Sequence, residues 1–170
     1  LLLMLLYIRF GLSPSFFVYM VFIAALVVIT FVDLEHRIIP DIISLPGIPL
    51  GFAFSFILPN VTWASSLLGI LLGSGLLLAV ALGYELITHK EGMGMGDIKL
   101  LGMMGGFLGW QGVLFTIFVS SVMGSLVGIV AMLSARADTK YAIPYGPFLS
   151  AGGVLYVFNG PQFIHWYLGW

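Results

Sequence analysis

Residues 92–100 read GMGMGDIKL, a stretch in which glycine stands at every second position before an acidic residue, Asp97. Long apolar runs lie on both sides of it in the sequence. Glycine permits backbone conformations and close approaches that other residues cannot make, so the stretch predicts an irregular segment between two helices. Asp97 is therefore either an ordinary helix-end charge or a functional carboxylate, and the rest of the chain has to decide between them.

The composition indicates a polytopic membrane protein. Of the 170 residues, 61% are hydrophobic and 8% are charged, which is too few charges to cover the surface of a soluble domain. The six basic residues are scattered and the net charge is −1, so a nucleic-acid partner is not expected. The chain has no cysteine, which excludes thiol catalysis and a cysteine-ligated zinc site within it. The lipid bilayer is the expected environment.

Polar and Pro/Gly breaks divide the chain into about seven apolar segments, at residues 1–8, 15–33, 41–58, 63–87, 97–109, 111–134 and 147–168. A helix that crosses a membrane needs about 20 residues. The first segment is expected to be a helix cut by the start of the sequence. The helix at 97–109 is expected to begin below the membrane surface, after a non-helical stretch. We predict an all-α membrane protein with about six transmembrane helices and one short helix, in a single domain over residues 1–170.

The charged residues predict the orientation of this domain. Loops 34–40, 88–96 and 135–146 lie on one side, and five of the six Arg and Lys residues lie in these loops or close beside them. The positive-inside rule makes that side cytoplasmic. All seven acidic residues lie at or near the same face, so any chemistry is expected there.

Two aspartates are the strongest candidates for a functional role, because ionisable groups within a membrane are costly and usually functional. Asp33 ends the apolar run VVITFV, and Asp97 follows the Gly-Met-Gly of residues 94–96. Two carboxyls brought together can share a proton, so that one deprotonates water while the other protonates a carbonyl oxygen. Asp41, after Pro40, is instead expected to act at the positive end of a helix.

Glycines spaced four residues apart predict close contacts between helices in lipid. The three pairs are Gly69/Gly73, Gly105/Gly109 and Gly124/Gly128.

Three motifs, in order, resemble those of the type IV prepilin peptidase family, which belongs to the Gly-x-Gly-Asp intramembrane aspartyl proteases. VDLEHRIIPD at 32–41 is similar to the first, an Asp and a charged turn followed by Ile-Pro and Asp or Asn. GMGMGDIKLLGMMGGFLGW at 92–110 is similar to the second, including a lysine two residues after the aspartate. KYAIPYGPFLSAGG at 140–153 is similar to the third, a Pro-x-Gly-Pro-Phe turn that enters the last helix.

The resemblance implies that Asp33 and Asp97 are the catalytic pair of an aspartic endopeptidase. Asp41 matches a position at which the family accepts Asn, which argues against an essential acid there. Lys99 either sets the charge of the pair, meets the substrate, or simply extends to the cytoplasmic surface. The supporting positions that the motifs carry over are Gly94, Gly96, Lys99, Pro144, Gly146 and Pro147.

The resemblance also implies the substrate. The family removes the basic leader from type IV prepilins and type II secretion pseudopilins at the cytoplasmic face of the bacterial inner membrane, in agreement with the orientation above. Bifunctional members carry an upstream cytoplasmic domain with paired cysteines that resembles a zinc ribbon, and they N-methylate the product with S-adenosylmethionine. We expect that domain to be absent from this chain and the peptidase to need no cofactor, so zinc and S-adenosylmethionine are expected only with that domain.

Other interpretations stay open. Presenilin-like proteases share Gly-x-Gly-Asp but carry Pro-Ala-Leu where this chain has Pro-Tyr-Gly-Pro at 144–147, and an archaeal preflagellin peptidase would differ only in substrate. An ion-coupled transporter would use intramembrane acids, with internal repeats and acids near mid-membrane. A metal hydrolase could draw on His36, His89, Glu35 and Glu91, although the H-E-x-x-H spacing is missing.

Overall fold

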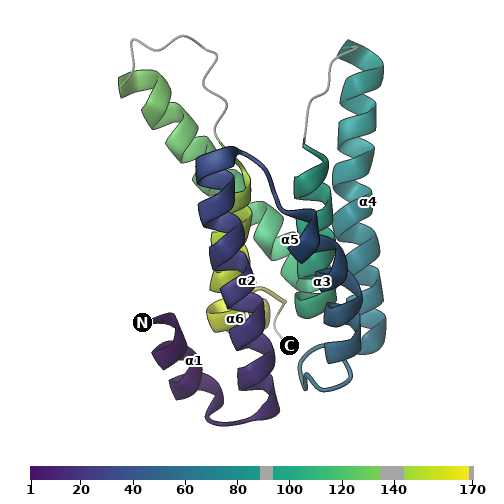
Figure 1. The fold of residues 1–170 in the computed structure, drawn as a ribbon, viewed down its shortest axis with the longest axis vertical. Coiled ribbons are helices and arrows are strands. Elements are labelled where there is room, and N and C mark those ends of the chain that lie inside the picture. Colours follow the sequence, from purple (N-terminus) through teal and green to yellow (C-terminus); the bar gives the residue numbers. More distant parts are fainter. Residues whose placement is uncertain (89–93, 135–143, 169–170) are drawn as a thin grey trace.

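The computed structural model describes residues 1–88, 94–134 and 144–168. This part of the chain is built of helices joined by short connections (Figure 1). They are α1 (Leu2–Phe10), α2 (Pro14–His36), α3 (Asp41–Phe54), α4 (Trp63–Thr88), α5 (Met95–Ser134) and α6 (Gly146–Leu168). A backbone surrounded by lipid must satisfy its hydrogen bonds internally, which a helix does within one segment. The predicted all-α fold class is confirmed.

Three of the described helices are long and apolar enough to cross a membrane, namely Pro14–His36, Trp63–Thr88 and Met95–Val130. The total of about six transmembrane helices stays a prediction.

α3 is shorter than the apolar segment that the sequence predicted at 41–58. The helix ends at Phe54, and the Ser55 hydroxyl donates to the Phe52 carbonyl at 2.7 Å in the turn that follows. The apolar residues after this turn do not continue the helix. Leu58 is buried, which explains why a non-helical stretch keeps an apolar sequence.

α5 consists of two arms that meet at Gly109. The first arm is residues 95–108 and the second is residues 110–134. Gly109 has φ 73° and ψ 178°, a conformation that is open to glycine but strained for other residues. In Figure 1 the first arm runs down to this point and the second arm returns upward. The predicted separation of the segments 97–109 and 111–134 is therefore confirmed.

The first arm of α5 lies at the centre of the molecule. Its residues from Leu100 to Leu108 are buried on every face. The Phe107 ring stacks on Phe22 of α2 with the centroids 4.6 Å apart, and Met104 borders Gly153 of α6. A helix that is apolar all round is expected in such a position, since every face needs a neighbour.

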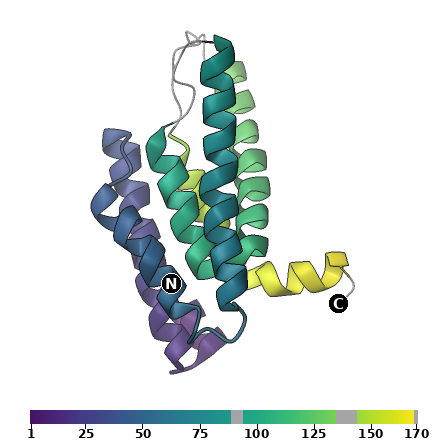
Figure 2. The ribbon, with the colours of Figure 1, turned by 90° about the vertical axis from the view of Figure 1, so that its right-hand side faces the viewer.

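Glycines let α4 approach the first arm at backbone distance, and Figure 2 shows the two helices side by side. A Cβ added to Gly69 would lie 2.5 Å from the Gly105 carbonyl oxygen, and one added to Gly73 would lie 2.5 Å from the Leu101 carbonyl oxygen. In the same contact the Ser66 hydroxyl donates to the Gly106 carbonyl at 2.8 Å. The small-residue contacts predicted for the first two glycine pairs are confirmed.

The prediction for the third pair is wrong. A Cβ on Gly124 would make only ordinary contacts, the nearest being Tyr145 at 3.7 Å, and one on Gly128 would meet nothing within 4 Å among the described residues. Spacing alone did not distinguish a packed pair of glycines from a pair on an open face.

The α4–α5 contact predicts a difference between two glycines of α4. Gly69→Ala should lower the free energy of unfolding by about 1–3 kcal/mol, because the added methyl group overlaps the Gly105 backbone. Thermal unfolding in detergent micelles measures the effect. Gly75→Ala is the control, since a Cβ there meets nothing within 4 Å. Equal stability of the two variants would contradict the packing described here.

Candidate functional site

Asp33 lies in the last turn of α2 with its side chain turned into the protein. The helix ends where Arg37 adopts the left-handed conformation, φ 55° and ψ 39°, and the Arg37 amide donates to the Asp33 carbonyl at 2.9 Å. The residue is 5% exposed. Its carboxylate oxygen Oδ2 accepts a hydrogen bond from the Gly146 amide at 3.0 Å. A buried acid is costly unless it is hydrogen-bonded, so this amide is a main determinant of the carboxylate position.

The donor of this hydrogen bond is the first residue of α6. The first amides of a helix have no partner within it and carry partial positive charge, so the Asp33 carboxylate satisfies the start of another helix. A Cβ on Gly146 would lie 2.6 Å from Asp33 Oδ2, so the predicted supporting role of this glycine has a steric reason. Pro147 follows in the first turn, where its missing amide costs nothing. Pro144, the other predicted proline, lies just before the helix.

Asp97 lies in the first turn of the first arm of α5. Its amide donates to the Gly94 carbonyl at 3.1 Å, and its side chain is half-buried. The two aspartates are close enough for the charge of Asp33 to act on Asp97. The structure thus brings together the two acids that the motifs singled out, from helices that are far apart in the sequence. Their catalytic role stays a prediction.

The two glycines before Asp97 differ in what surrounds them. A Cβ on Gly96 would lie 2.8 Å from Cβ of Ile39, whereas one on Gly94 would meet only Asp97 Oδ2, at an ordinary 3.7 Å. Neither is among the described glycines with positive φ. The close approach expected of this stretch is confirmed at Gly96, and the expectation of an unusual backbone conformation is wrong for both.

Lys99 does not stand free beside the aspartates. Its ammonium nitrogen Nζ donates to both carboxylate oxygens of Asp41, at 2.8 and 2.7 Å. Asp41 lies in the first turn of α3, as predicted for a negative charge at a positive helix end. The sequence suggested three roles for Lys99 and missed this ion pair, because nothing in the spacing of two residues in different motifs reports their distance.

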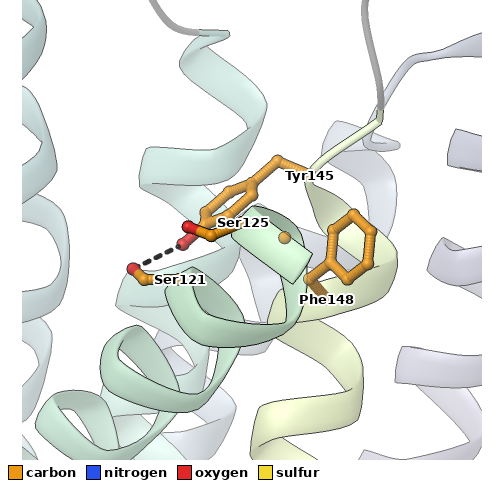
Figure 3. Close-up of a pocket in the computed structure, with 5 residues that line it drawn as sticks. Ser121, Ser125, Tyr145 and Phe148 are labelled. Atoms are coloured by element: carbon orange, nitrogen blue, oxygen red, sulfur yellow. Dashed lines mark hydrogen bonds between the residues drawn. The ribbon is translucent and has the colours of Figure 1, made fainter. Parts of the chain in front are cut away.

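A pocket of about 360 Å³ opens beside the start of α6 (Figure 3). Tyr145 reaches across to the second arm of α5, where its hydroxyl lies 2.8 Å from Ser120 Oγ and 3.5 Å from Ser121 Oγ. Since Tyr145 directly precedes Gly146, the pocket lies next to the amide that holds Asp33. The sequence placed Tyr145 in the third motif but gave no sign of its partners. The lining residues are Ser121, Gly124, Ser125, Tyr145 and Phe148.

The described residues do not group into a metal site. No cluster of three His, Asp or Glu side chains occurs among them. Of the residues considered for a metal hydrolase, His89 and Glu91 lie outside the described ranges. The chain has no cysteine, and the expectation that the peptidase needs no cofactor stays a prediction.

Comparison with known proteins now adds to this geometry. Residues 20–129 match the model of the type IV leader peptidase family. The chain is 34% identical over 143 residues to the prepilin leader peptidase/N-methyltransferase of Aeromonas hydrophila, covering 84% of this chain and 49% of that protein. The protein of the same name from Xanthomonas campestris is 34% identical over 160 residues, or 94% of this chain and 56% of that protein.

The chain therefore spans about half the length of the curated relatives that it matches. No solved structure matches it significantly. The family match includes Asp33 and Asp97 and the segment between them, and the matches to the two relatives extend over most of the chain. The chain belongs to the type IV leader peptidase family.

Proposed function

We propose that this chain is the aspartic endopeptidase part of a prepilin leader peptidase, with Asp33 and Asp97 as its catalytic pair. One arrangement carries the proposal: two carboxyls from separate motifs lie at the end of α2 and at the start of α5, and an electrostatic interaction links them. One of them is buried and bonded to a backbone amide. An aspartic protease needs such a pair within reach of one substrate carbonyl.

The chemistry follows from what each oxygen can do. The carboxylate of the pair takes a proton from water, which attacks the scissile carbonyl carbon, while the protonated partner donates to the carbonyl oxygen. An amide N–H can only donate, so Oδ2 of Asp33 serves as the acceptor for Gly146. Oδ1 of Asp33, which takes no part in this bond, is the oxygen that we assign to water or substrate. The hydrogen bond fixes the direction in which that oxygen points.

The proposed substrates are the leaders of type IV prepilins and type II secretion pseudopilins, cut at the cytoplasmic face of the bacterial inner membrane. Support comes from the relatives, which are named prepilin leader peptidases, and from the basic residues near this end of the helices. In the described part, Arg37 and Lys99 lie beside the two aspartates in sequence. The N-methyltransferase activity is named for the relatives, and the function proposed for this chain is the peptidase alone.

The ion-coupled transporter is the alternative from another functional class. A transporter of this kind is expected to carry acids near the middle of the membrane, in internally repeated segments. Asp33 lies in the last turn of α2 and Asp97 in the first turn of α5, so the acids favour the peptidase.

The catalytic pair predicts the effect of three isosteric substitutions. Asp33→Asn and Asp97→Asn should each lower the rate of leader cleavage by about a thousandfold or more, because an amide cannot exchange the proton. Asp41→Asn should keep most of the activity, since its amide oxygen still accepts a hydrogen bond from Lys99. The masses of the products from a prepilin peptide measure cleavage. An inactive Asp41→Asn together with an active Asp33→Asn would reverse the assignment.

A second prediction concerns the reagents that inhibit the enzyme. Catalysis by carboxyls alone should survive thiol reagents, serine-directed reagents and EDTA, with less than about a twofold change in rate. The same peptide assay, in detergent, measures it. Activity that EDTA removes and zinc restores would favour the metal hydrolase instead.

The glycines of the second motif predict a graded response. Gly96→Val should inactivate strongly, because its side chain would displace Ile39 and with it the start of α5. Met95→Val should be tolerated, since Met95 is 57% exposed, and Gly94→Ala should be tolerated because a Cβ fits there. Relative kcat values for the three variants test this order. Equal losses at all three positions would show that the stretch acts only as a linker.

A further inference from the structure

The connection between α2 and α3 touches the start of α5 at two points. Ile39, which is 7% exposed, packs its Cβ against the backbone of Gly96. Asp41 binds Lys99 through both carboxylate oxygens. The two contacts flank Asp97 in the sequence, one residue before it and two residues after it. They join the start of the first arm to α3 and its preceding turn.

The same connection begins at the end of the helix that carries Asp33. Arg37 closes α2 through the hydrogen bond that its backbone N–H donates to the Asp33 carbonyl, and Pro40 is the N-cap residue of α3. The short segment of residues 37–41 therefore begins at the turn that carries Asp33. It ends at Asp41, which binds Lys99 in the turn that carries Asp97. Because of this segment, the distance between the two carboxyls depends on the contacts of Ile39 with Gly96 and of Asp41 with Lys99.

We propose that the Lys99–Asp41 ion pair is a positioning element that holds Asp97 at its working distance from Asp33, and that Lys99 does not bind substrate. The inference rests on the function proposed above. It accounts for the geometry of Lys99, whose ammonium group is engaged by Asp41 rather than directed at the aspartates.

The size of the effect follows from the exposure of the pair. The side chains are 27% exposed for Lys99 and 55% for Asp41, and pairs of this kind add little to stability. Catalysis is more sensitive, since small misplacements of a reacting group lower kcat severely. We therefore expect loss of the pair to lower kcat by about three- to tenfold with little change in thermal stability.

A double-mutant cycle tests the proposal. The variants are Lys99→Met, Asp41→Ala, the double variant, and the charge exchange Lys99→Asp with Asp41→Lys. Each single variant should lower kcat for the prepilin peptide by a similar factor with KM unchanged, and the double variant should be no worse than either single one. The charge exchange should recover part of the loss. Glu85→Ala is the matched control, because it removes an exposed carboxylate from α4 and should leave kcat unchanged.

Three results would overturn the inference. A raised KM in Lys99→Met alone would make the lysine a substrate contact. Opposite shifts of the pH dependence of kcat in Lys99→Met and Asp41→Ala would show that charge, not position, matters, since the two variants change the net charge in opposite directions. A kcat equal to that of the wild type in both single variants would show that the Lys99–Asp41 ion pair has no role in catalysis. Asp33→Asn and Asp97→Asn, measured alongside, separate this failure from that of the proposed function, which fails if either variant still cleaves.

Discussion

The structure depends on the close approach of other backbones to the first arm of α5. Water does not drive helices together within a bilayer, so packing at short range has to hold them. Glycines allow this close approach on two sides of the arm. Gly69 and Gly73 of α4 face it on one side, and Gly47 and Gly51 of α3 face it on another. The two remaining sides are closed by aromatic and methionine side chains against α2 and α6. Once this arm is enclosed, the position of its first turn, and hence of Asp97, is set.

A single electrostatic rule describes three of the acids at this end of the molecule, Asp33, Asp41 and Asp97. Helix N-termini carry partial positive charge and attract anions. Asp41 and Asp97 lie in the first turns of α3 and α5, and Asp33, although it ends α2, accepts its hydrogen bond from the start of α6. Each of these three acids thus lies at a helix start, and for Asp33 that helix, α6, is not the one that carries the acid. For the buried Asp33, the start of α6 thus supplies part of the stabilisation that water gives to an exposed carboxylate.

Much of this arrangement was readable from the sequence. Apolar runs and their breaks located the helices, including the short first arm of α5, because lipid demands length and continuity. The motifs singled out Asp33 and Asp97. The partners of these residues could not be read, since Gly146, Lys99 and Ile39 meet their contacts across the fold. The sequence also does not tell why a glycine is needed at a position. At Gly96 the reason is lack of space for a side chain, not an unusual backbone conformation.

The bond between Asp33 and Gly146 has a consequence for biosynthesis. A membrane protein is made from its N-terminus, and its helices enter the bilayer in that order. When α2 to α5 are in place, both aspartates are already present in the membrane, yet the donor that orients Asp33 has not been inserted. The geometry of the pair is completed only when α6 packs against α2. The position of the Asp33 carboxylate is thereby coupled to the insertion of α6, the last described helix.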